Sequence, residues 1–147
     1  MIRDATEEDI KILVDIGESF WATTEYARDG AVYSKERALS SAMLCIKNGF
    51  ALVSDNEGLD GMALFLIAPS CFSDDKGATE MVFFVSPGKR GAGIGRSLLE
   101  AARIKALESG CNRISVGNMF GSSPESSDSL FKSMGFHIAE TTYTMKV

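Results

Sequence analysis

Apolar residues recur at helical spacing in two stretches of the first third of the chain. Thr6 precedes three acidic residues, as an N-cap does, and a 3.6-residue apolar period then predicts a helix over about residues 6–18. Its apolar positions are Ile10, Leu13, Val14 and Gly17. A second helix is predicted to follow Ser34 as N-cap and to stop at Gly49. Its apolar face comprises Ala38, Leu39, Ala42, Met43 and Ile46.

Shorter apolar runs in the middle of the chain predict strands. Residues 50–54 and 61–68 flank the turn sequence Asp-Asn-Glu-Gly at 55–58, which is typical of an antiparallel hairpin. A polar loop is predicted over residues 69–78. The β-branched and aromatic run at 80–85 then predicts a strand, which ends at Ser-Pro-Gly.

The last third predicts a helix, a strand, a short helix and a strand-forming end. The two helices cover residues 96–109 and 126–134, a short strand covers 112–117, and residues 136–147 supply one or two final strands. This order predicts an α/β (α+β) fold: a mixed, mostly antiparallel central sheet flanked by helices, with a parallel pair of strands around the third helix.

Composition limits the class of protein. A chain of 147 residues can bury one substantial core, so we expect a single domain over residues 1–147. The net charge of −5 argues against nucleic acid as a partner. Neither a signal peptide nor an 18-residue apolar run is present, so we expect a cytoplasmic protein without a membrane partner.

The cysteines and the histidine offer little for a metal site. Cys45, Cys71 and Cys111 are widely separated and match neither a disulfide framework nor a CxxC ligand pair, so we expect reduced thiols. His137 is the sole histidine, and we expect it at the surface. The sequence therefore predicts no metal and no Ser-His-Asp triad.

A glycine-dense loop joins the predicted strand at 80–85 to the predicted helix at 96–109. Such a junction gathers free backbone N–H groups and the positive end of a helix around one point, which suits an anion. Gly91, Gly93 and Gly95 would let the backbone approach a phosphate without a Cβ in the way, although a tight turn also explains them. Local positive charge comes from Lys89, Arg90 and Arg96.

Two common phosphate motifs do not fit this loop. The dinucleotide pattern GxGxxG needs a glycine or alanine where Arg96 stands, and it normally opens a fold. The Walker pattern needs a glycine in place of Arg90 and a lysine in place of Arg96.

Residues 85–99, Val-Ser-Pro-Gly-Lys-Arg-Gly-Ala-Gly-Ile-Gly-Arg-Ser-Leu-Leu, closely resemble the signature of the GCN5-related N-acetyltransferases (GNAT). Arg90, Gly93 and Gly95 occupy the pattern positions, and residues 130–136 resemble a later helix with its Gly-Phe ending. The predicted element order agrees along the chain. A looser similarity, at residues 71–75 and 117–121 with the following Pro-Glu, is to small acetyltransferases of phages and prophages.

The resemblance implies a protein that binds acetyl-coenzyme A as co-substrate and transfers its acetyl group directly to an amine. The pantetheine arm would pair with the backbone of the central strand, and amides of the loop would hold the pyrophosphate. The implied cofactor-binding residues are Phe83, Phe84, Val85, Lys89, Arg90, Gly91, Ala92, Gly93, Ile94, Gly95, Arg96 and Phe131.

The resemblance also implies two proton-transfer positions. Glu80 interrupts an apolar strand where several family members carry a catalytic glutamate, so it is the candidate general base; a solvent-facing strand end is the alternative. The acid of the family is a tyrosine at the position of Phe131, and phenylalanine cannot donate a proton. The substitutes left open are Tyr143, Ser129, Ser127 or water.

The acceptor amine belongs to a small molecule or to a protein, and we expect it to bind near residues 20–29 and Tyr33. Glu25 and Asp29 suit a cationic amine there. Packing in the core explains the aromatic residues Phe20 and Trp21 equally well. Phe131 favours a second hypothesis, a catalytically weak or inactive domain that binds coenzyme A as a ligand or structural element. A nucleotide-binding module is a weaker third. Family members are often dimers, and residues 83–84 or a strand from Thr141 could form a homodimer.

Overall fold

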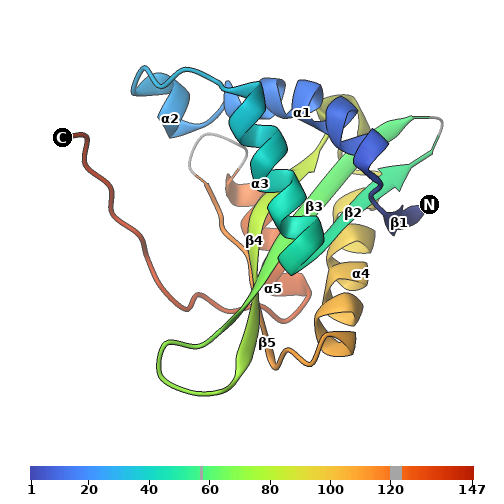
Figure 1. The fold of residues 1–147 in the computed structure, drawn as a ribbon, viewed down its shortest axis with the longest axis vertical. Helices are drawn as coiled ribbons and strands as arrows, with labels where there is room; N and C mark the ends of the chain where they lie inside the picture. Colours follow the sequence, from blue (N-terminus) through green and yellow to red (C-terminus); the bar gives the residue numbers. More distant parts are fainter. Residues whose placement is uncertain (57, 120–123) are drawn as a thin grey trace.

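A five-stranded sheet with helices on both faces forms the body of the protein (Figure 1). This computed structural model describes residues 1–56, 58–119 and 124–147. Glu57 of the predicted turn and residues 120–121 of the phage-type similarity lie outside the described residues. The elements are β1 (Ile2–Asp4), α1 (Glu7–Trp21), α2 (Glu25–Arg28), α3 (Lys35–Asn48), β2 (Gly49–Asp55), β3 (Leu59–Pro69), β4 (Lys76–Val85), the 3₁₀ helix η1 (Pro87–Lys89), α4 (Ile94–Glu108), β5 (Arg113–Ser115) and α5 (Pro124–Ser133).

The sheet has the order β1-β2-β3-β4-β5 and is antiparallel except at one edge. There β4 and β5 run parallel, with Gly77 opposite Arg113 and Thr79 opposite Ser115. Parallel neighbours need a crossover, and α4 provides it. The predicted mixed sheet, with its parallel pair around the third long helix, is confirmed.

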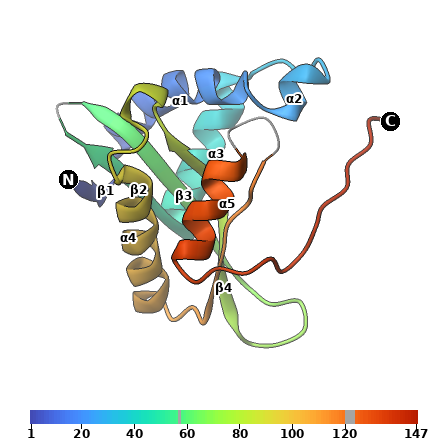
Figure 2. The same ribbon diagram turned by 180° about the vertical axis from the view of Figure 1, so that it is seen from behind.

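The two faces of the sheet bury different helices (Figure 2). Helices α1 and α3 cover one face, where Ile10 and Cys45 are fully buried against Ala51 and Leu64. Burial raises the pKa of the Cys45 thiol to about 11, so the thiol stays protonated. Helix α4 covers the other face. Its buried residues Leu98, Leu99, Ala102 and Ala106 pack in one cluster with Phe50, Leu52, Phe65 and Phe131.

A capping box fixes the start of α1. The Thr6 side chain accepts from Asp9 N–H, while the Asp9 carboxylate accepts from Thr6 N–H. Arg3 of β1 donates to Asp9 at 2.7 Å and to Asp55 of β2 at 2.8 Å. The hydrogen bond from Arg3 holds the pKa of Asp9 well below its usual range. The predicted N-cap is confirmed, and this cluster ties it to two strands.

Short or exposed elements are where sequence and structure differ. β1 and α2 are too short to show a period, and neither was predicted. The prediction of a polar loop over residues 69–78 is wrong at both ends, because β3 continues to Pro69 and β4 begins at Lys76. Here Pro69 pairs with Lys76 and Ala68 with Gly77, so a proline, a lysine and a glycine interrupt the apolar pattern that predicts a strand.

The prediction of final strands over residues 136–147 is wrong. Phe136 packs against Phe131, with ring centroids 5.9 Å apart, but none of residues 136–147 belongs to a strand or helix of the described chain. The segment runs away from the body as an extended tail (Figures 1 and 2). Strand propensity alone does not make a strand, which also needs a partner edge.

Candidate active site

Helix α4 begins directly after the glycine-dense loop and leaves its first amides open. The first helical hydrogen bond runs from Ser97 N–H to the Gly93 carbonyl, at 3.0 Å, and no side chain among the described residues caps the helix. The N–H groups of Ile94, Gly95 and Arg96 therefore have no acceptor within the helix. Together with the positive end of the helix they present the kind of environment that suits an anion.

The three glycines of this loop serve different purposes. Gly91 and Gly93 have φ of 86° and 80°, a left-handed conformation that side chains disfavour, and a Cβ on either would meet nothing within 4 Å. A Cβ on Gly95 would instead lie 3.2 Å from Leu130 and 3.4 Å from Phe83. The sequence interpretation, that all three make room for a phosphate, is thus corrected at Gly95, whose missing side chain lets α4 pack against β4 and α5.

Three exposed cations surround the loop, and each is positioned by a neighbour. Lys89 Nζ lies 3.8 Å from the Asp60 carboxylate. Arg90 Nε donates to the Val85 carbonyl at 3.1 Å, at the end of β4. Arg96 Nη2 donates to Ser133 Oγ of α5 at 2.6 Å. These contacts keep positive charge at the helix N-terminus of an acidic protein.

Asp60 is a residue that sequence reasoning missed. It is 7% exposed, and its carbonyl accepts from Ser86 N–H at 2.8 Å, while its carboxylate faces Lys89. It thereby fixes both ends of the turn that leads from β4 into the loop. Its place in the hairpin between β2 and β3, far away in sequence, gave no signal of this role.

Strands β4 and β5 separate beyond residue 79. Their pairing stops at Thr79 and Ser115, whereas β4 continues to Val85 along β3. The β5-facing edge of residues 80–85 thus has no strand beside it within the described part of the chain. The residues that the resemblance assigns to the pantetheine arm, Phe83, Phe84 and Val85, lie on this open stretch.

A bulge in β4 lies next to Glu80. Leu64 pairs with Val82 but the next residue, Phe65, pairs with Glu80, so Met81 is the extra residue. A bulge shifts the alternation of faces by one residue. As a result Phe83 and Val85 pack in the cluster of α4 and α5, and Phe84 turns to the face of α1.

The Glu80 side chain reaches across the opening between the strands. Its Oε2 accepts from the Gly117 N–H at 2.8 Å, two residues past the end of β5. Burial raises the pKa of Glu80, and hydrogen bonds from the backbone of Gly117 and Phe83 oppose the rise. A partly buried carboxyl with a raised pKa is better suited to accept a proton near neutral pH than a solvent-facing one.

Phe131 lies in the core. It is 7% exposed and packs between the rings of Phe83, 6.1 Å away, and Phe136. Of the substitute acids, Tyr143 is 91% exposed on the tail, whereas Ser127 and Ser129 belong to α5. The position at which the resemblance implies an acid therefore carries a side chain that packs and cannot donate a proton.

The predicted acceptor region divides into packed and exposed residues. Phe20 packs against Phe84, with ring centroids 5.4 Å apart, and Trp21 packs against Tyr33 at 5.6 Å. The Tyr33 hydroxyl donates to the Val14 carbonyl at 2.7 Å. Tyr26 of α2 is 62% exposed. The core interpretation is thus right for Phe20, and α2 is the part of the region left at the surface; His137 is exposed, as expected.

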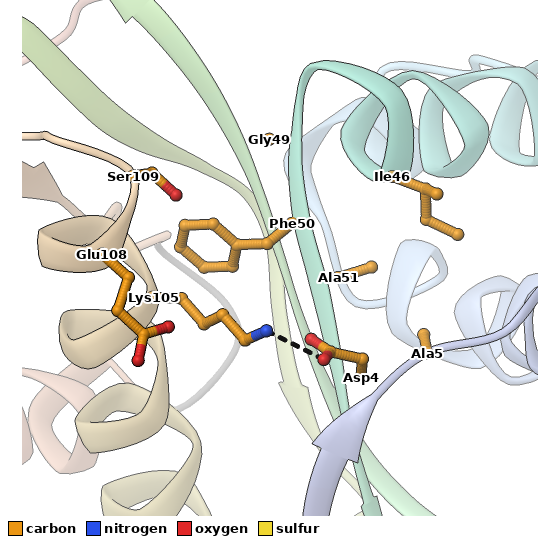
Figure 3. Close-up of a pocket in the computed structure, with 9 residues that line it drawn as sticks. All are labelled: Asp4, Ala5, Ile46, Gly49, Phe50, Ala51, Lys105, Glu108 and Ser109. Carbon is orange, nitrogen blue, oxygen red and sulfur yellow. Dashed lines mark hydrogen bonds and ion pairs between the residues drawn. The ribbon is translucent and has the colours of Figure 1, made fainter.

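A hollow of about 310 Å³ lies elsewhere, between the C-terminal parts of α3 and α4 (Figure 3). Phe50 is one of its lining residues, and the Lys105 side chain reaches from α4 to Asp4 at 2.8 Å. None of the loop residues or Glu80 lines it. We assign it no role in the chemistry.

Other classes of site find no support in the described residues. No group of three His, Cys, Asp or Glu side chains there could hold a metal ion. None of the helices in the described ranges combines the length and apolar character needed to cross a bilayer. The three cysteines are free, with Cys71 exposed.

The fold defines an α/β protein with a glycine-dense loop between a parallel strand and its crossover helix. Residues 46–138, more than half of the chain, match the family model of the acetyltransferase (GNAT) domain. The chain belongs to this family of acetyl-coenzyme A-dependent acyltransferases. No curated protein matches the sequence.

Solved structures share the fold at low sequence identity. A transcriptional regulator from Bacillus halodurans C-125 is 22% identical, with a TM-score of 0.77 over 100% of this chain and 99% of that one. A ribosomal-protein-alanine N-acetyltransferase from Brucella melitensis biovar Abortus 2308 is 15% identical, with a TM-score of 0.76 over 100% of this chain and 98% of that one. AAC(6')-Iy, in complex with a bisubstrate analog containing coenzyme A, is 14% identical, with a TM-score of 0.76 over 100% of this chain and 97% of that one.

Proposed function

We propose that the whole chain acts as one N-acetyltransferase domain that moves an acetyl group from acetyl-coenzyme A to a primary amine. The observation that carries the proposal is the conjunction of three features at one edge of the sheet. These are the open amides at the start of α4, the unpaired edge of β4 beyond Thr79, and the carboxyl of Glu80. Family membership makes acetyl-coenzyme A the expected donor.

The residues present fit the donor. The amides of residues 94–96 would hold the pyrophosphate, and Lys89, Arg90 and Arg96 would add charge. Open space above Gly91 and Gly93 leaves room for phosphate oxygens. The backbone of residues 83–85 would pair with the amide-bearing pantetheine arm, which would compete for the Val85 carbonyl with Arg90.

Bound acetyl-coenzyme A would supply a thioester, whose C–S bond breaks as the amine nitrogen forms a bond to the acetyl carbon. Glu80 would take the proton that this nitrogen loses, directly or through water. The thiolate would leave with a proton from solvent, because Phe131 has none to give. Holding the two reactants together would supply much of the rate.

The acceptor is a small molecule or a protein amine. The structural neighbours include enzymes named for a ribosomal protein and for aminoglycosides, so the fold admits both classes. We place acceptor binding beside α2, where Tyr26 and Glu25 are exposed. We also propose a cytoplasmic location and, from residues 71–75, a relationship to the phage-type enzymes.

Phe131 supports a second candidate, a domain that binds coenzyme A without efficient turnover. Its ring fills the acid position and packs between Phe83 and Phe136, so the site lacks a protein acid there. Such a domain would use coenzyme A as a ligand or structural element.

One experiment separates the two candidates. Calorimetry would measure binding of coenzyme A and acetyl-coenzyme A, and a thiol-detecting assay would follow turnover over a panel of polyamines, aminoglycosides and peptides with free N-termini. Binding with thiol release supports the transferase, and binding without turnover on any amine supports the second candidate. Absence of coenzyme A binding would overturn both.

A further inference from the structure

The Val85 carbonyl lies on the open edge of β4. Ser86 N–H donates to the Asp60 carbonyl of β3 at 2.8 Å. The Phe84 carbonyl also faces β3, because a Cβ on Gly61 would lie only 2.8 Å from its oxygen. Successive residues of a strand direct their N–H and C=O groups to opposite edges. The N–H and C=O groups of Val85, between these two residues, therefore face the edge that β5 leaves open beyond Thr79.

The Arg90 side chain covers the acceptor of this edge. Its Nε donates to the Val85 carbonyl at 3.1 Å, in a contact that is exposed to solvent. An exposed hydrogen bond to a neutral carbonyl contributes little net free energy, because water can replace either partner. Arg90 therefore holds the Val85 carbonyl reversibly, and a ligand that pairs with this carbonyl has to displace it.

A stronger acceptor for Arg90 arrives with the proposed donor. Arg90 stands four residues before Ile94, whose N–H is the first of the open amides at the start of α4. A guanidinium binds phosphate oxygens through two parallel, charge-assisted hydrogen bonds, each about twice as strong as one to a neutral group. A pyrophosphate at these amides would compete with the Val85 carbonyl for Arg90, and the charge-assisted bonds favour the pyrophosphate.

The other two cations of the loop are held differently. Lys89 Nζ lies 3.8 Å from the Asp60 carboxylate, and Arg96 Nη2 donates to Ser133 Oγ. Moving either cation to a phosphate would release a side chain and would leave the edge of β4 as it is. Movement of Arg90, in contrast, would uncover a backbone acceptor on this edge.

We infer that Arg90 is a specificity-determining residue for the donor, because it covers the Val85 carbonyl until a pyrophosphate draws it away. The inference rests on the proposed binding of coenzyme A and adds what selects coenzyme A over fragments without a pyrophosphate. A ligand that carries only the pantetheine arm has to displace Arg90 without offering it a new partner. Pyrophosphate and arm therefore help each other to bind, and this coupling is reciprocal.

The first test asks whether two fragments of coenzyme A, inorganic pyrophosphate and pantetheine, bind cooperatively to the full chain. NMR titrations of the isotope-labelled protein would give its affinity for pantetheine with and without saturating pyrophosphate. We expect pyrophosphate to raise this affinity about two- to tenfold, the factor that one net hydrogen bond is worth. Independent binding of the fragments, or competition between them, would overturn the inference.

The second test compares Arg90→Met with Lys89→Met, since each removes one positive charge from the loop. Both variants should bind coenzyme A more weakly in calorimetry. Arg90→Met should also bind pantetheine alone about two- to tenfold more tightly and lose the coupling to pyrophosphate, whereas Lys89→Met should change neither property. Unchanged or weaker pantetheine binding in Arg90→Met would mean that Arg90 stays on the Val85 carbonyl as a fixed tether, and would overturn the inference.

These experiments separate a failure of the inference from a failure of the proposed function. If coenzyme A binds to the unmodified protein while its two fragments bind independently, the proposed function stands and the role of Arg90 is wrong. Absence of coenzyme A binding would overturn both. The fragment titrations use the unmodified protein, so they decide the matter even where Arg90→Met does not fold.

Discussion

The Glu80 carboxylate accepts a hydrogen bond from the Gly117 N–H at 2.8 Å, across the gap that opens where β4 and β5 stop pairing. The contact joins the two sides of the opening at its closed end. A Cβ on Gly117 would lie 3.4 Å from the same carboxylate oxygen, so the approach is already at van der Waals distance. The backbone beyond β5 thus fixes the direction of the candidate base.

Glu80→Gln tests the base directly. Glutamine keeps an oxygen for the Gly117 N–H but cannot take up a proton, so kcat is expected to fall by about 10²–10⁴-fold with little change in coenzyme A affinity. Steady-state kinetics and calorimetry would check this. Glu36→Gln, on the exposed first turn of α3, is the control and should match the unmodified protein. If the affinity for coenzyme A fell in Glu80→Gln by as large a factor as kcat, Glu80 would act in binding rather than as the base.

The raised pKa of Glu80 predicts opposite trends for activity and stability with pH. Catalysis needs the carboxylate, so kcat/KM should rise with pH through a pKa above the ordinary carboxyl value. The folded protein holds this proton to higher pH than the unfolded chain does, so stability from Glu80 falls as pH rises through the same window. Rate profiles and urea titrations from pH 4 to 8 would measure both. In Glu80→Gln the contribution at the Glu80 pKa should be absent from both profiles.

Gly93→Asp should abolish coenzyme A binding. The position has φ of 80° and open space above it, so the added carboxylate would stand at the open amides of α4 and repel a pyrophosphate. Gly93→Asn is the matched control, because asparagine has the same shape and tolerance of this φ but no charge. Calorimetry should show a much larger loss for Asp than for Asn. Unchanged affinity in Gly93→Asp would refute the loop assignment.

Gly95→Ala tests packing rather than charge. Its Cβ would lie 3.2 Å from Leu130 and 3.4 Å from Phe83, so the free energy of unfolding is expected to fall by about 1–3 kcal/mol. Gly88→Ala places its Cβ in open space and should change stability far less. Urea unfolding of both variants would measure the difference. Equal changes in the free energy of unfolding of the two variants would show that α4 has room to shift.

The Arg3–Asp9 pair predicts sensitivity to acid. Because Arg3 lowers the pKa of Asp9, the unfolded chain binds more protons than the folded one. The stability that this carboxylate contributes is therefore present above its ordinary pKa, about 3.9, and is lost as pH falls below it. Asp9→Asn should lower stability at pH 7 and flatten its fall between pH 5 and 2, in urea titrations. Asp74→Asn, in the exposed β3–β4 loop, should leave that fall unchanged.

Local patterns predicted most of the fold. The caps at Thr6 and Ser34 and the hairpin between β2 and β3 are each encoded within a few residues, so the sequence was enough to predict them. The ends of β3 and β4 were not predictable this way, because Pro69, Lys76 and Gly77 interrupt the apolar pattern where the two strands pair. The prediction for residues 136–147 was wrong because strand propensity alone is not enough: no strand of the described residues pairs with this segment.

The candidate site was predictable in its loop and less so around it. The glycines, cations and Glu80 stand in one continuous stretch, and the family resemblance assigns them roles. The contributions of Asp60, Gly117 and Ser133 were missed, because each comes from another element. Nothing in their local sequence indicates these contacts.

The sequence by itself determined the order of the longer helices and the central strands, the glycine-dense loop before α4 and membership of the family, because helix periods, caps and glycine spacing are local properties. Only the tertiary structure decided that Gly95 packs while Gly93 stays open, that Phe131 is enclosed by Phe83 and Phe136, and that β4 and β5 part at Thr79. Those outcomes depend on which surfaces meet in space. The opening that Glu80 spans is therefore a property of the folded sheet.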